Sequence, residues 1–311
     1  MKGERAQATL GAPQVPGLRA QGSAGSSCKR KATSSIVRGM DESDLFAGNW
    51  VLITGASSGL GEVFARELAE RRANLVLTAR SQDKLESLAR ALAETHGIAT
   101  EVIALDLSGP GSAERLCVEV DRRGHPIDHL ISNAGFGRGG PFLDSDGQRL
   151  AEMVRLNCEA LTVLTHHFLG PMVARGRGGV IHLASTASFQ PAPYMATYAA
   201  TKAFVLSLSD ALGEEVRAST HGRVRVMALC PGPVPTGFQS AAGTQIAPSQ
   251  KRAVLSAEET VRRGLVAYEA GKSVYVPGGL NRIGTVGARI LSRRMMVRMV
   301  GKMMKAKEPI A

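Results

Sequence analysis

Residues 50–70 read WVLITGASSGLGEVFARELAE, and this stretch decides the fold of the chain. An apolar run over Trp50–Thr54 leads into a turn with glycines at 55, 59 and 61, and a helical pattern follows over Gly59–Arg72. Glycine permits tight turning and a close approach of the backbone to a ligand. The first N–H groups of a helix attract an anion. The stretch therefore predicts a cradle for a pyrophosphate group.

The same alternation of short apolar runs and helical stretches continues along the chain. Strands without polar alternation are buried on both faces, and repeated strand–helix units build parallel sheets with right-handed crossovers. The sequence thus predicts an α/β protein with a doubly wound parallel sheet, a Rossmann fold with helices on both faces. Further strands are expected at residues 74–79, 100–105, 128–132, 179–184, 223–229 and 273–276, and helices at 82–96, 112–123, 148–175, 195–218 and 257–270.

Composition divides the chain into three regions. Residues 1–45 are rich in Gly, Ala, Ser, Gln and Pro without a hydrophobic period, which indicates a disordered basic extension. Their Arg- and Ser-rich, acid-poor character also fits an organelle transit peptide, and Met40 leaves open an over-long start. Residues 46–280 form the expected nucleotide-binding domain, and residues 281–311 form a basic tail.

The formal net charge of +11 lies mostly at the two ends. Residues 1–40 carry +6 and residues 281–311 carry +7, which leaves −2 on the body between them. A near-neutral body argues against nucleic-acid binding. The four scattered cysteines form no C-x-x-C, which favours a reducing, cytoplasmic setting without structural zinc. We expect no metal site and, without a run of 18 uncharged apolar residues, no membrane-spanning helix.

Residues 289–305 combine basic and apolar residues at helical spacing. Arg and Lys recur every three to five positions, with Met, Ile, Leu and Val between them. This pattern predicts a basic amphipathic helix. It could lie on an anionic membrane surface or pack on the body or on a second subunit.

The turn also invites a different interpretation. Gly55–Gly59 fits G-x-S-x-G, the nucleophile elbow of hydrolases. An elbow needs earlier strands to supply an oxyanion hole, whereas this turn follows the first strand. The position of the motif therefore disfavours a hydrolase.

The end of the second predicted strand bears on cofactor choice. NAD-binding proteins place an acid there to accept from the ribose 2′-hydroxyl. This chain has Ala79 followed by Arg80, and arginine can stack on adenine and pair with a 2′-phosphate. The pattern favours NADP, although a solvated loop arginine would look the same.

Tyr198 and Lys202 stand at i and i+4 on one helix face. A nearby ammonium and a nicotinamide cation favour the phenolate and lower the tyrosine pKa from about 10. Such a tyrosine can exchange a proton with an alcohol or carbonyl near neutrality. An ordinary Tyr–Lys pair is the alternative. Ser185, at the end of a predicted strand, can hold a substrate oxygen and is preferred over nearby Ser188, and Asn157 lies within the preceding helix.

In this combination the chain resembles the short-chain dehydrogenase/reductase family over roughly residues 48–240. The resemblance extends to an NADP-preferring bacterial branch related to ketoacyl and ketosteroid reductases. Only Ser132, where the family often has a second Asn, departs from the pattern. The motifs that carry it are the TGxxxGxG turn at 54–61, Asp106, the NAG at 133–135, the set Asn157, Ser185, Tyr198 and Lys202, and PGPVPT at 231–236.

The resemblance implies a role for each matching position. Tyr198 would be the general acid in reduction, Ser185 would polarise the carbonyl, Lys202 would bind the nicotinamide ribose and lower the tyrosine pKa, and Asn157 would hold a relay water. Asp106 and Leu107 would meet adenine, and Val234 and Thr236 the carboxamide. The cofactor-binding set is Gly55, Ser57, Ser58, Gly59, Leu60, Gly61, Arg80, Asp106, Leu107, Asn133, Ala134, Gly135, Tyr198, Lys202, Pro231, Gly232, Val234 and Thr236.

Apolar residues flank these motifs and suit a hydrophobic ketone or secondary alcohol, although they could equally be packing. Gly237–Ser256 is expected to form a mobile lid. We therefore expect an NADP(H)-dependent oxidoreductase, and the resemblance implies a homo-oligomer. A non-catalytic nucleotide-binding scaffold and a peripheral membrane protein are the alternatives. The flanking residues are Phe136, Phe142, Phe189, Pro191, Pro193, Tyr194 and Met195.

Overall fold

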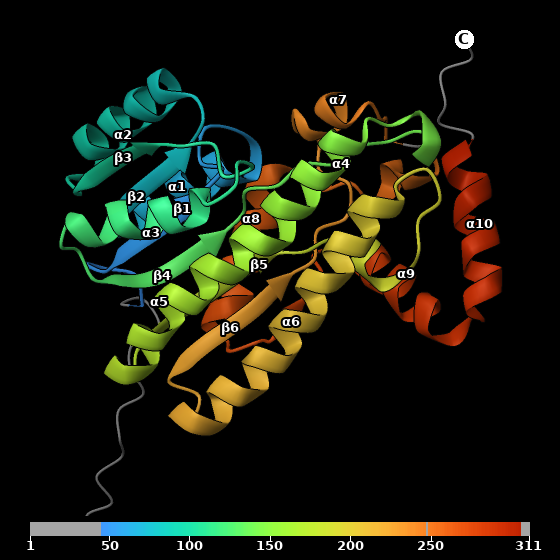
Figure 1. Ribbon diagram of the computed structural model, residues 1–311. Helices are drawn as coiled ribbons and strands as arrows, with labels where there is room; N and C mark the ends of the chain where they lie inside the picture. The colour runs from blue at the N-terminus through green and yellow to red at the C-terminus, as the bar shows by residue number, and fades with distance from the viewer. Residues whose placement is uncertain (1–44, 247, 306–311) are drawn as a thin grey trace, which may run out of the picture. The chain divides into compact units, whose positions relative to one another are not determined.

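The computed structural model describes residues 45–246 and 248–305. Within them, seven strands form one parallel sheet in the order β3-β2-β1-β4-β5-β6-β7 (Figure 1). The chain builds outward from β1 to β3 and then returns to β4 on the other side of β1. The carboxyl ends of β1 and β4 therefore border the crevice where open α/β sheets bind ligands. The strands are β1 (Trp50–Thr54), β2 (Asn74–Ala79), β3 (Thr100–Ala104), β4 (Ile127–Ser132), β5 (Gly178–Leu183), β6 (Val224–Leu229) and β7 (Val274–Tyr275).

Helices cover both faces of the sheet, as the sequence predicts (Figure 1). One hydrophobic cluster joins the sheet to α1 (Gly59–Glu70), α2 (Gln82–His96) and α8 (Ala257–Glu269). A second cluster joins the opposite face to α3 (Ser112–Arg122), α5 (Leu161–Arg175) and α6 (Ala196–Thr220). Every residue of β4 and β5 is buried, because helices lie above and below them.

The long helix expected at 148–175 is interrupted. It consists of α4 (Gly147–Val154), a π-helical segment over Arg155–Ala160, and α5. A π-helical segment inserts an extra residue into a helix, and such segments are frequent at functional sites. Hydrophobic periodicity does not reveal it, because apolar residues continue through it. Its consequence is to redirect Asn157, described below.

The region after β6 begins with two short helical segments, α7 (Phe238–Ala242) and a 3₁₀ segment over Pro248–Ala253, within the stretch expected to be a lid. The tail then divides into α9 (Gly279–Ile290) and α10 (Arg293–Lys305), so the helix expected at 289–305 does not run unbroken. The inner side of α10, with Met296, Val300 and Met304, packs against Ala192 and Ala199. Packing on the body was one of the alternatives that the sequence left open.

The expectations for residues 1–44 lie outside the described residues. Within the ranges that the structure describes, no helix has the length and apolarity to cross a membrane. No three His, Cys, Asp or Glu side chains in those ranges group so as to hold a metal ion.

Candidate active site

Three glycines in the turn between β1 and α1 stand at positions that disfavour a side chain. Gly55 and Gly59 adopt φ of 69° and 58°, in the left-handed region that glycine enters without strain. A Cβ at Gly61 would lie 2.2 Å from the carbonyl oxygen of Gly55. Ser58, the N-cap of α1, makes no side-chain hydrogen bond to the helix. The first N–H groups of α1, beside Ser57, are thus left for an anion, while Leu60 packs on the core.

The end of β4 is tied to this turn through Thr54. The backbone N–H groups of Asn133 and Ala134 donate to Thr54 Oγ1 at 3.0 and 2.9 Å. Asn133 Nδ2 donates to the carbonyl oxygens of Thr54 and Gly55 at 2.9 and 3.2 Å. The side-chain amide of Asn133 therefore holds the glycine turn against the end of β4.

Arg80 and Asp106 face each other at the carboxyl ends of β2 and β3. Arg80 Nη1 lies 3.9 Å from Asp106 Oδ2, and the guanidinium is exposed. Burial opposes ionisation of Asp106, but hydrogen bonds from Ser108 and the charge of Arg80 outweigh it and lower the pKa of this carboxyl. Leu107 is buried in the core beneath this edge. The exposed guanidinium, with Ala79 in place of an acid, fits a 2′-phosphate.

Ser185 and Tyr198 bring their hydroxyls together beyond the end of β5. Ser185 is the N-cap of a 3₁₀ turn over Thr186–Phe189, and Tyr198 lies in the first turn of α6. Their side chains share a hydrogen bond. Lys202, one turn further along α6, donates from Nζ to the Leu183 carbonyl oxygen at 2.5 Å. Its Nζ lies 5.9 Å from the centre of the Tyr198 ring.

Burial dominates the titration of both α6 side chains. It raises the pKa of Tyr198 to about 12, and only the hydrogen bond with Ser185 opposes it. It lowers the pKa of Lys202 to about 8. The direction for Tyr198 is opposite to the lowering that the sequence predicts, because desolvation penalises the phenolate and the Lys202 ammonium is turned toward Leu183. Any lowering must come from a cation bound beside the ring.

Asn157 projects from the π-helical segment into the site. Its Oδ1 accepts from the Phe136 N–H at 3.1 Å, and its Nδ2 donates to the Phe136 carbonyl and to Thr201 Oγ1, both at 3.0 Å. A Cβ at Gly135 would lie 2.9 Å from Asn157 Oδ1 and 3.6 Å from Lys202 Nζ. Gly135 thereby lets Asn157 clamp the β4 loop against α6.

Ser188 has a structural role that differs from the role of Ser185. Its hydroxyl donates to the Lys202 carbonyl at 2.8 Å and accepts from the Ser185 N–H at 3.2 Å. With the bond from Ala187 N–H to Ser185 Oγ at 3.1 Å, this completes a capping box. Ser188 thus holds the turn on α6, and Ser185 is the serine that meets Tyr198.

The segment after β6 closes the other side of the crevice. The Pro231 carbonyl accepts from Thr186 N–H at 2.9 Å, and Gly232 leaves room for Asn281, whose Oδ1 would lie 2.3 Å from an added Cβ. Val234 is buried. Thr236 lies beside Gly59, 3.5 Å from the place of a Cβ there. The 231–236 segment and the glycine turn therefore border the same space.

Phe238 is a site residue that the sequence analysis did not single out. Its ring lies against that of Tyr198, with centroids 5.4 Å apart. A Cβ at Gly137 would lie 2.8 Å from Phe238 and 3.2 Å from the Tyr198 ring. The bond from Gly139 N–H to the Ala242 carbonyl, at 2.8 Å, joins α7 to this loop. Phe238 is the only aromatic residue in Gly237–Ser256, a signal that could have found it.

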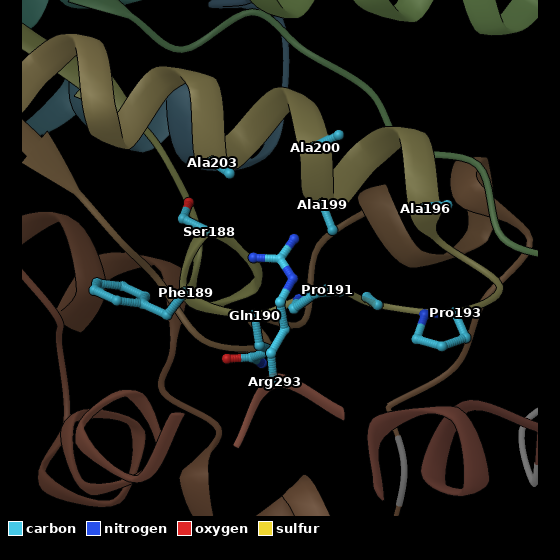
Figure 2. Close-up of a pocket in the computed structure, with 11 residues that line it drawn as sticks. Ser188, Phe189, Gln190, Pro191, Pro193, Ala196, Ala199, Ala200, Ala203 and Arg293 are labelled. Atoms are coloured by element: carbon cyan, nitrogen blue, oxygen red, sulfur yellow. The ribbon is translucent and has the colours of Figure 1, made fainter. Parts of the chain in front are cut away.

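A cavity of about 370 Å³ lies behind the 3₁₀ turn (Figure 2). Phe189, Pro191 and Pro193 line it, together with alanines of α6, and Arg293 points into it. Those alanines occupy a face of α6 that carries neither Tyr198 nor Lys202. The cavity is therefore not where the two hydroxyls act. Phe142 and Tyr194 line a smaller hollow with Arg138.

The model of the short chain dehydrogenase family matches residues 49–247. The chain belongs to this family. The short-chain dehydrogenase expected from the sequence is thus confirmed, and with it the class of oxidoreductase.

Other short-chain dehydrogenases resemble the chain in sequence and structure. It is 35% identical over 179 residues to the Very-long-chain 3-oxoacyl-CoA reductase of Phaeosphaeria nodorum, a match that covers 56% of this chain and 52% of that protein. The chain thus spans about half the length of the curated relatives it matches.

Two solved structures cover more of the chain. A short-chain dehydrogenase from Sphingobium yanoikuyae in complex with NADPH has a TM-score of 0.69 and 32% identity, over 78% of this chain and 94% of that one. The bulky-bulky ketone specific alcohol dehydrogenase of Comamonas testosteroni has a TM-score of 0.66 and 29% identity, over 78% and 92%. The NADPH of the first agrees with the cofactor expected from the sequence.

Proposed function

We propose that the chain is an NADPH-dependent reductase of ketones that carry bulky apolar groups. The main support for this proposal is the hydrogen-bonded pair Ser185 and Tyr198. Lys202 lies one helical turn further along α6, and the glycine turn before α1 borders the same crevice. The relatives support it, because their names refer to 3-oxoacyl-CoA reduction and to bulky ketones.

The chemistry divides between cofactor and chain. When bound, NADPH supplies the hydride for the carbonyl carbon. The Ser185 hydroxyl holds the carbonyl oxygen, and the Tyr198 O–H bond breaks as its proton passes to that oxygen. A pKa of about 12 keeps Tyr198 protonated until that moment. The phenolate left behind recovers its proton from solvent.

Asn157 positions the loop after β4 relative to the part of α6 that carries Lys202. Its amide holds the Phe136 backbone and Thr201, the residue next to Lys202, in one network. Because Phe136 follows Gly135 and Thr201 precedes Lys202, these bonds hold the Gly135 backbone and Lys202 at a fixed distance from each other. Water relay through Asn157, which the family resemblance implies, fits this location beside the lysine.

The substrate class follows from what surrounds the hydroxyl pair. Phe238 packs on Tyr198, and Met195 lies near Gly137 on the same side. These side chains offer apolar contact and no charge to the substituents of a ketone. Esters of 3-oxoacyl groups and bulky diaryl or steroid ketones are therefore the first compounds to test.

We further propose that two copies associate through α6. Ala200, Ala203 and Phe204 lie on one exposed face of this helix, and Phe204 is 42% exposed. Ala200 and Ala203 also border the cavity that Arg293 enters. Small residues around one large apolar side chain allow close helix packing across a two-fold axis.

Tyr198→Phe tests the proposed acid. It should lower kcat for reduction by about two to four orders of magnitude, which is the usual contribution of a general acid. The affinity for NADPH should stay within about twofold of the wild type. Stopped-flow turnover and fluorescence titration measure the two quantities. Tyr275→Phe removes a hydroxyl elsewhere and should match the wild type. Equal turnover in Tyr198→Phe and wild type would overturn the proposal.

Arg80→Ala tests the cofactor preference. Loss of a charge-assisted bond to the 2′-phosphate should weaken NADPH binding about tenfold or more and leave NADH binding nearly unchanged. Fluorescence titration with both nucleotides measures this. Arg90→Ala removes another exposed arginine, on α2, and should change neither affinity. Equal weakening of NADPH and NADH would contradict the role of Arg80.

A further inference from the structure

The helix α9 presents apolar side chains to solvent. Leu280, Ile283 and Val286 recur on one side of the helix and are 55%, 69% and 51% exposed. Asn281 faces the body instead, where its Nδ2 donates to the carbonyls of Ala253 and Pro277 at 2.9 Å. Thr285 is also buried. A helix that packs on a body usually has the reverse arrangement, with apolar residues inside.

The next helix, α10, also exposes apolar side chains, on a side other than its buried one. Met296, Val300 and Met304 are taken up by contacts with the body. Met295 and Met299 remain 48% and 51% exposed. Several exposed apolar side chains on each of two consecutive helices mark an interaction surface more clearly than single scattered ones do.

The segment that carries these two helices has charge of one sign. From Ala270 to Lys305 the chain contains eight Lys and Arg residues and no Asp or Glu. Arg282, Arg294 and Arg298 are exposed beside the apolar residues. In the part of the chain that the structure describes, these three form no ion pair.

We infer that α9 and α10 dock on an anionic lipid surface, with Leu280, Ile283 and Val286 in the acyl boundary and the arginines at the head groups. Apolar side chains flanked by unpaired cations are what such a surface binds. A second copy fits less well, because a two-fold interface would set the same row of cations against itself. Docking does not depend on the proposed reduction.

Docking is tested by co-sedimentation of the full chain with phosphatidylcholine vesicles and with mixed phosphatidylcholine–phosphatidylserine vesicles. We expect at least tenfold stronger partition onto the mixed vesicles, reduced by added salt. The double variant Ile283→Ser/Val286→Ser should lose at least tenfold in partition. The control Val118→Ser/Val266→Ser removes two comparably exposed valines on α3 and α8 and should bind as wild type.

Three outcomes would overturn the inference. They are no binding of the wild type to either vesicle, equal binding to both vesicles, and unchanged binding of the Ile283/Val286 variant. Loss of self-association in that variant without any vesicle binding would assign the surface to a second copy instead. NADPH titration of the double variant checks that it folds, since neither residue touches the crevice.

Discussion

At the scale of single residues, Lys202 couples the site to protein stability. Its pKa is about 8 in the folded chain, below its ordinary value of 10.5, because burial penalises the ammonium. Below pH 8 the lysine is charged in both the folded and the unfolded chain, and its desolvation lowers the stability of the folded chain. Between pH 8 and 10.5 the lysine binds more protons in the unfolded chain than in the folded one. The contribution of Lys202 to the free energy of unfolding therefore rises with pH.

Lys202→Met should therefore be more stable relative to wild type at pH 7 than at pH 10. The change in this difference should reach a few kcal/mol, since each pKa unit corresponds to about 1.4 kcal/mol. Urea unfolding of both proteins at the two pH values measures it. Comparing the two proteins cancels the titration of buried groups that Lys202 does not influence, such as Tyr268. A difference independent of pH would mean that Lys202 titrates normally.

Residue types and spacing predicted which side chains lie together, but not the direction in which the pKa of Tyr198 shifts. Tyr198 and Lys202 lie together because i and i+4 share a helix face. Ser185 could be favoured over Ser188 by its place at a strand end, whereas the capping box that occupies Ser188 is visible only in three dimensions. The raised pKa of Tyr198 depends on burial, which spacing does not report.

At the scale of elements, the strands and most helices were predictable within one or two residues, because burial on both sides gives unbroken apolar runs. The π-helical segment was not, since it changes backbone hydrogen bonding without changing hydrophobic spacing. The division of the tail into α9 and α10 was missed as well. Apolar residues at helical spacing do not say which side faces the body, and α9 faces it with Asn281.

At the scale of the whole molecule, the sheet order explains why distant motifs meet. The chain leaves β3 and re-enters beside β1, so the glycine turn and the β4 loop share one edge. The turn after β5, with Ser185, and the segment after β6 continue that edge. Residues separated by 177 positions, Gly59 and Thr236, thereby become neighbours. The order of motifs in the sequence implied this arrangement, while the position of Phe238 over Tyr198 depends on α7.

The proposed association through α6 belongs to this scale and predicts a mass. Wild type should behave as a dimer or tetramer in light scattering after size exclusion, and Phe204→Glu should shift the mass toward the monomer, because a buried unpaired carboxylate opposes close packing. Val118→Glu places the same charge on α3 and should leave the mass unchanged. A monomeric wild type, or an oligomer that Phe204→Glu does not disturb, would exclude α6 as the contact. Because Phe204 lies on a different face of α6 from Tyr198, NADPH binding should survive in the monomer.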